Sequence, residues 1–236
     1  MFGAVMSDLA KYQFPVFDEW TLYDRIVRRD YMKHEAISVS VAKALSEELE
    51  ELDVLDLGCG CGLMAAKILR ELKVTNYTGV DLSEAGLSRV QQSLRGITEH
   101  IQVKKSDLVS FLQQNSSLSP TLLLASYSLH HFPFDELSAI LKGIQATMNP
   151  LGFFVWIDPT RQSHESRDEF IRRFMYEIST QWEDLDSSEL REVEEHISTS
   201  DYPLDEEEQR SLLSACGFES VLECYRDTFY SAKIVR

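Results

Sequence analysis

The stretch VLDLGCGCGLMAAKIL, residues 54–69, decides the fold that the sequence predicts. A short apolar run leads to Asp56, and an apolar pattern with helical spacing begins at Leu63. Glycine occupies every second position between them, at Gly58, Gly60 and Gly62. Because glycine has no Cβ, it allows a sharp turn and the close approach of a ligand to the backbone. The stretch therefore predicts a buried strand, a ligand-binding turn and a helix, in that order.

The same alternation continues along the chain. Short apolar runs predict strands at 53–57, 77–81, 101–105, 121–126 and 153–158. Helical spacing predicts helices at 63–72, 83–94 and 134–148, the second with Ser83 as its N-cap. Strands that alternate with helices predict an α/β fold with a largely parallel sheet, covered on both faces.

The C-terminal part predicts an antiparallel edge for this sheet. DEEEQRSLLSACGF predicts a helix that ends near Gly217, and strands are expected at 220–225 and 228–235. Since only Arg226 and Asp227 separate these strands, they should form a hairpin.

The alternation stops between Asp158 and this C-terminal helix. Ser166 and Glu169 have the spacing of a capping box, and a second acidic helix is expected at 187–197. We expect this insertion, at about 160–203, to be a helical lid. The N-terminal residues 1–33 are rich in aromatic side chains and predict a helical cap segment.

Charge and composition narrow the classes of partner. The chain has 39 acidic and 23 basic residues, a net charge of -16. Such a field repels phosphate backbones, so DNA is not expected as a partner and RNA is disfavoured, although a high charge also simply aids solubility. The sequence contains no run of eighteen apolar residues, so a membrane span is not expected. The N-terminus lacks a secretion signal, so we expect a cytoplasmic protein.

The four cysteines predict thiols rather than a metal centre. Cys59 and Cys61 form a C-x-C pair inside the glycine turn, and Cys216 and Cys224 stand far from it. Common zinc sites use C-x-x-C spacing, so the sequence predicts no metal site.

Acidic residues stand at the ends of three predicted strands. Asp81 can accept hydrogen bonds from both hydroxyls of a ribose, and Asp107 can accept one from the exocyclic amine of an adenine. Asp107 can equally cap the helix that follows it. Asp56 can help to hold an ammonium group, directly or through water. Leu63 stands where a dinucleotide fingerprint requires glycine, so an oxidoreductase that uses NAD is disfavoured.

Together, VLDLGCGCG, YTGVDLS, KKSDL, LLLASYSLHHF and GFESVLECYRDTFYSAKIVR resemble the class I S-adenosylmethionine (SAM)-dependent methyltransferases. The resemblance covers roughly residues 36–158 and 204–236. It implies a seven-stranded, mostly parallel sheet in the order 3-2-1-4-5-7-6, with strand 7 antiparallel and helices on both faces. It also implies a SAM-binding methyltransferase domain over 34–236 that contains the lid.

The resemblance implies SAM as the cofactor and S-adenosylhomocysteine (SAH) as the product. It places Asp81 on the ribose, Asp107 near the adenine and the glycine turn beneath the methionine portion. The cofactor-binding residues predicted in this way are Asp56, Gly58, Cys59, Gly60, Gly62, Asp81, Leu82, Ser106, Asp107, Leu108, Ser126 and Tyr127.

Residues after the fourth and fifth strands are candidates for the acceptor pocket. His130 or His131 could remove a proton from the acceptor, with His131 preferred, although a structural role for the pair stays open. Candidate substrate contacts are Tyr12, Tyr23, Tyr31, Asp158, Arg161 and Phe174. Arg161 could instead pair with Asp158 or the acidic lid, and the aromatic residues could instead pack the lid onto the core.

The sequence thus predicts methyl transfer from SAM to a small-molecule acceptor by in-line displacement. The alternatives are a protein or, less favoured, an RNA methyltransferase, and a non-catalytic SAM-binding partner subunit. The oligomeric state is left open.

Overall fold

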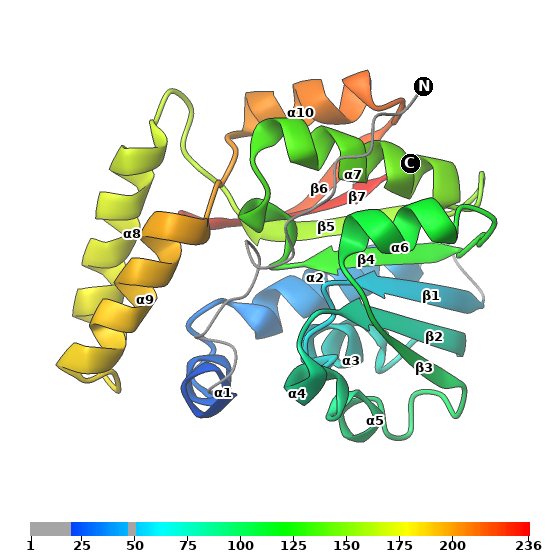
Figure 1. Ribbon diagram of the computed structural model, residues 1–236, viewed down its shortest axis with the longest axis horizontal. Coiled ribbons are helices and arrows are strands. Elements are labelled where there is room, and N and C mark those ends of the chain that lie inside the picture. The colour runs from blue at the N-terminus through cyan, green and yellow to red at the C-terminus, as the bar shows by residue number, and fades with distance from the viewer. Residues whose placement is uncertain (1–19, 47–50) are drawn as a thin grey trace.

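The computed structural model describes residues 20–46 and 51–236, and its sheet has the order β3-β2-β1-β4-β5-β7-β6 (Figure 1). The strands are β1 Leu52–Leu57, β2 Val74–Asp81, β3 Ile101–Lys105, β4 Leu122–Ser126, β5 Phe153–Pro159, β6 Val221–Arg226 and β7 Tyr230–Val235. Strands β1 to β5 pair in parallel, and β7 is antiparallel to both β5 and β6. The predicted fold class, strand order and directions are confirmed.

Helices cover both faces of the sheet (Figure 1). They are α1 Trp20–Arg28, α2 His34–Ser46, α3 Leu63–Leu69, α4 Glu84–Leu87, α5 Val90–Ser93, α6 Leu108–Gln114, the 3-10 helix η3 Leu129–His131, α7 Phe134–Thr147, α8 Arg167–Gln181, α9 Ser187–Ser200 and α10 Glu206–Ala215. Alternate residues of a strand face opposite sides, so neighbours such as Leu122 and Leu123 enter different apolar clusters. Helices α2, α3 and α8 pack in one cluster, and α6, α7 and α10 in the other.

Two local predictions were wrong. The helix expected from Ser83 to residue 94 is two short helices, although Ser83 does cap the first by accepting a hydrogen bond from Gly86 N. Gly86 has low helix propensity, which weakens a continuous helix there. The hairpin turn is also longer than two residues, because β7 begins at Tyr230 rather than at residue 228. Asp227 Oδ1 accepts hydrogen bonds from Phe229 N and Tyr230 N and so holds these residues in the turn.

Helices α8 and α9 lie beyond the edge of the sheet at which the parallel strands end, and α1 lies on the same side (Figure 1). The insertion leaves and rejoins the domain at one point, where Thr160 and Leu204 form a parallel bridge. The predicted capping box of Ser166 and Glu169 is present at the start of α8, and a second one, formed by Asp186 and Glu189, caps α9. The boundaries of the cap segment and of the lid stay predictions. Within the described ranges, no helix is long and apolar enough to cross a membrane.

Candidate active site

The glycine turn, Gly58–Gly62, has a backbone that other residues adopt rarely. Gly58, Gly60 and Gly62 have φ angles of 70°, 52° and 74°. A Cβ on Gly58 would lie 2.4 Å from the Cβ of Ser128, so a side chain there would displace the loop that follows β4. The turn is also tied to β2, because Gly58 N donates to Val80 O over 2.8 Å. The glycines therefore let strand β1 turn tightly between two neighbouring strand ends.

Asp81, at the end of β2, fixes the middle of this turn. Its Oδ2 accepts a hydrogen bond from Gly60 N at 2.7 Å, and its Oδ1 accepts one from Ser83 N at 2.8 Å. Burial raises the pKa of Asp81, while these backbone donors and the nearby His131 act against the rise. A carboxylate has about four lone-pair sites, so the side chain keeps acceptor capacity for a ligand.

Asp56 lies buried beneath the turn. Its Oδ2 accepts a hydrogen bond from the Tyr77 hydroxyl at 2.6 Å, whereas Oδ1 accepts none from any described residue. The pKa of Asp56 is raised to about 7, mainly by burial. The hydrogen bond from Tyr77 opposes this rise, and the charge of Asp81 adds to it. Buried polar atoms are normally hydrogen-bonded, so this oxygen is suited to a cationic ligand or a bridging water.

Asp107 caps α6, because its Oδ1 accepts a hydrogen bond from Ser110 N at 2.8 Å. The capping role that the sequence left open is therefore present, and contact with an adenine stays a prediction. The neighbours predicted with it are Ser106, whose hydroxyl donates to Asp107 O at 3.0 Å, and the buried Leu108.

The loop after β4 carries backbone strain. Tyr127 has a φ of 53°, which is uncommon for a bulky residue and costs on the order of 1–3 kcal/mol. Its hydroxyl donates to Met32 O at 2.6 Å, and the Ser128 hydroxyl donates to Leu57 O at 3.0 Å. These bonds hold the loop against both the N-terminal segment and β1.

The two histidines follow this loop on η3 and are both buried. His130 Nδ1 lies 2.7 Å from Asp158 Oδ1, and Asp158 Oδ2 accepts a hydrogen bond from Trp156 Nε1 at 2.6 Å. Burial alone would lower the pKa of His130, but the carboxylates of Asp158 and Asp201 outweigh it and raise that pKa. The Nδ1 atom of His131 is engaged as well, 3.2 Å from Asp201 Oδ1 and 3.3 Å from Ser200 O, so the choice of base between the two histidines stays a prediction.

Most predicted substrate contacts have partners within the fold. Both carboxylate oxygens of Asp158 are used, which favours an orienting role for it. The Arg161 guanidinium binds Pro203 O at 2.6 Å, the Glu165 carbonyl and the Glu208 carboxylate, so it fastens the base of the insertion.

The predicted aromatic contacts separate into three groups. Phe174 is buried in a cluster of rings with Phe170, Trp182, Phe229 and Tyr230. Tyr31 is half-buried, and its ring stacks on Trp182 at 5.0 Å. Burial and the neighbouring charges of Cys61 and Asp81 raise the pKa of Tyr23, which places it beside the glycine turn. Tyr12 lies outside the described residues.

A family model described as a methyltransferase domain matches residues 54–152, the part that holds the glycine turn, Asp81, Asp107 and both histidines. Residues 54–152 thus match a methyltransferase domain, and the sheet has the strand order that the resemblance to class I SAM-dependent methyltransferases implies. The match ends at Gly152, so β5, the insertion and the C-terminal hairpin of the methyltransferase lie beyond it.

Solved methyltransferases share this fold at low sequence identity. Human N-acetylserotonin methyltransferase, solved with SAM, is 18% identical with a TM-score of 0.58, and the match covers 84% of this chain and 51% of that one. The magnesium protoporphyrin IX methyltransferase of Synechocystis PCC 6803 is 17% identical with a TM-score of 0.58, over 94% and 95% of the two chains. The chain thus spans about half the length of the human enzyme.

A SAM-dependent methyltransferase from Clostridium acetobutylicum is 17% identical with a TM-score of 0.60, over 92% and 96% of the chains. A search of curated protein sequences gives no significant match. At these identities the structural likeness establishes the fold of the methyltransferase and leaves its acceptor to be inferred.

The residues of this methyltransferase domain fit SAM. The glycine turn offers bare backbone, the orphaned Asp56 Oδ1 suits an ammonium group or its water, and Asp81 offers acceptors for ribose hydroxyls. No basic residue lies between Asp56 and Gly62 to receive a pyrophosphate. The donor and acceptor set therefore suits an adenosine that carries a cationic tail.

Sequence reasoning missed several residues of the site. Asp201 and His196 come from the insertion. The Tyr77 hydroxyl donates to Asp56, and the Ser128 side chain lies directly against Gly58. Only the positions of Tyr77 and Ser128 beside predicted strand ends carried a signal. Asp201 and His196 reach the site through packing between distant segments, which no local pattern encodes.

Proposed function

We propose that the protein transfers a methyl group from SAM to a small-molecule acceptor by in-line displacement and releases SAH. The observation that carries this proposal is the glycine turn with Asp56 and Asp81 at the carboxyl edge of the sheet. When bound, SAM supplies a methyl carbon activated by a positive sulfur, so the protein has to align the acceptor, exclude water and dispose of one proton.

Each predicted cofactor contact has a distinct task. Asp81 would accept hydrogen bonds from the ribose hydroxyls, Asp107 would lie near the adenine, and Asp56 would hold the ammonium group through water. Leu82, Ser106 and Leu108 would flank the nucleoside. Ser126 and Tyr127 would border the methionine portion, beside the backbones of Gly58, Cys59, Gly60 and Gly62.

A small acceptor is favoured by two features. Helices α8 and α9 stand over the edge at which the cofactor would bind, and a covered site suits a substrate that can be enclosed (Figure 1). The net charge of -16 disfavours nucleic acid. Two of the similar solved enzymes are named for small acceptors, N-acetylserotonin and magnesium protoporphyrin IX. Four free cysteines fit the reducing cytoplasm that we propose as the location.

Binding selectivity tests the cofactor assignment. Titration calorimetry on the full chain should show one SAH bound per chain, and a large excess of NAD should leave that affinity unchanged, since the glycine turn lacks the dinucleotide spacing. Displacement of SAH by NAD would contradict the assignment and favour an oxidoreductase.

A further inference from the structure

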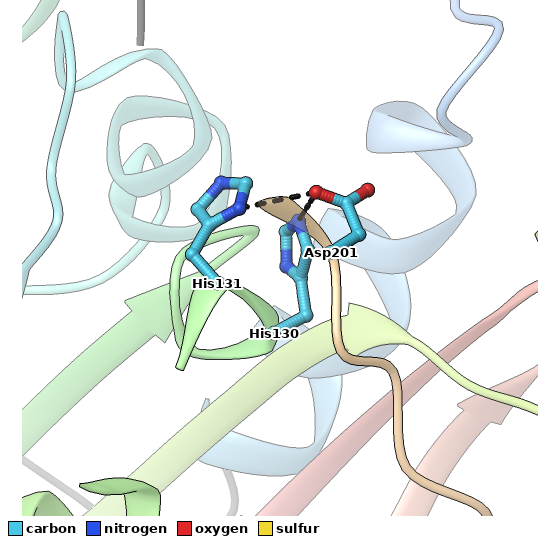
Figure 2. A group of neighbouring side chains, drawn as sticks. All are labelled: His130, His131 and Asp201. Carbon is cyan, nitrogen blue, oxygen red and sulfur yellow. Dashed lines mark ion pairs between the residues drawn. The ribbon is translucent and has the colours of Figure 1, made fainter. Parts of the chain in front are cut away.

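Three buried side chains with ligand atoms for a metal lie side by side and point toward one another (Figure 2). His130 and His131 come from η3, and Asp201 follows the last residue of α9. Their exposed fractions are 8%, 8% and 4%, and one ligand atom from each lies within 4.8 Å of the other two. We call these three residues the histidine–aspartate cluster.

The spacing of the cluster is close to that of a coordination shell. Asp201 Oδ1 lies 3.2 Å from His131 Nδ1 and 3.7 Å from His130 Nε2. Zinc bonds to nitrogen and oxygen of about 2.0–2.2 Å in tetrahedral geometry place ligand atoms roughly 3.3–3.6 Å apart. The two pairs that include Asp201 thus have nearly the spacing of zinc ligands, and the third pair, the two imidazole nitrogens, lies within 4.8 Å.

Asp201 supplies an independent indication of a ligand. Its Oδ1 is buried, yet it accepts no hydrogen bond of good geometry from the described residues, although imidazole nitrogens surround it. Besides the nitrogens of His130 and His131, His196 Nε2 lies 3.6 Å from this oxygen. A buried carboxylate oxygen without a hydrogen bond is costly, and a cation between it and the imidazoles would remove that cost.

A second layer of contacts orients His130 as metal ligands are oriented. The Nδ1 atom of His130 lies 2.7 Å from Asp158 Oδ1, and the Trp156 indole holds the other oxygen of Asp158. A histidine that ligates a metal usually donates its second N–H to a carboxylate, which fixes the tautomer and directs the free nitrogen at the ion. Here that arrangement would direct Nε2 at Asp201.

We propose that His130, His131 and Asp201 bind a divalent transition metal of the zinc type, with His196 beside it. Imidazole nitrogen favours such ions, whereas magnesium and calcium prefer oxygen ligands. The ion would fasten the end of α9 to η3. A coordinated His131 is then a ligand rather than the predicted base, and binding of the ion can be measured whether or not the protein transfers methyl groups.

Cobalt absorption tests this site directly. Metal-free, tag-free full chain is titrated with Co²⁺, whose visible absorption reports tetrahedral nitrogen and oxygen ligands, and Zn²⁺ is then added as a competitor. We expect one Co²⁺ per chain and its displacement by Zn²⁺. Asp201→Asn and His131→Ala should each weaken binding at least tenfold, and His164→Ala, an exposed histidine outside the cluster, should bind as the parent does.

SAH binding, measured on the same samples, separates this proposal from the proposed function. Variants that retain SAH binding are folded, so their loss of cobalt reports the site itself. The absence of a saturable cobalt band in the parent chain would overturn the proposal and leave a buried network of ion pairs. An unchanged band in both cluster variants would overturn it as well.

Discussion

Replacing Asp81 with asparagine should weaken SAH binding at least tenfold. The substitution keeps the shape of the side chain but removes the charge and one acceptor, while Gly60 N and Ser83 N still require acceptors. A hydrogen bond to a charged group contributes about 1.5–3 kcal/mol, and about 1.4 kcal/mol corresponds to a tenfold change in affinity. Titration calorimetry with SAH measures the effect.

Glu84→Gln is the matched control for this variant. Glu84 lies three residues beyond Asp81, is exposed and pairs with Lys105 at 2.9 Å, so its loss should leave SAH affinity unchanged. Equal affinities for the Asp81 variant and the parent chain would show that the ribose is bound elsewhere.

Replacing Asp158 with alanine should destabilise the fold by about 3–5 kcal/mol, the usual cost of leaving a buried charge without its partner. Asp158 is 2% exposed, accepts a hydrogen bond from Trp156 Nε1 and lies 2.7 Å from His130 Nδ1. The substitution therefore leaves the Trp156 indole and the His130 imidazole buried without this partner. The free energy of unfolding in urea measures the loss.

Asp53→Ala provides the comparison, because Asp53 is an exposed aspartate in β1, and its loss should change stability by roughly 0.5 kcal/mol or less. Replacing His130 by leucine in the Asp158→Ala background should restore part of the stability, since both members of the pair are then gone. A loss below about 1 kcal/mol in Asp158→Ala would mean that the pair carries little charge.

The strands and helices of the sheet could be predicted because their evidence is local, whereas the strand order followed from the family resemblance. Short apolar runs, the glycines after β1, and Asp81 and Asp107 at or just after the ends of β2 and β3 each lie within a few residues of the structure that they indicate. The capping box of α8 is equally local. Continuity of a helix is less certain, as the break between α4 and α5 shows, because a single weak position can divide it.

The partners of the polar side chains could not be predicted in the same way. Arg161 was a candidate for the acceptor pocket, but it binds Pro203 O and Glu208 across the base of the insertion. His131 meets Asp201 only because α9 packs over η3. Such pairs depend on how distant elements pack. The residue types therefore indicate which chemistry is available, but only the fold shows which side chains contact each other.

The most direct test of methyl transfer uses SAM with a heavy-isotope methyl group. The full chain is incubated with this SAM and a metabolite extract, and labelled products are sought by mass spectrometry, with Asp81→Asn as the control. We expect a labelled product of low mass that the control forms much more slowly. SAH binding without any labelled small molecule, or label found only on protein or RNA, would contradict it.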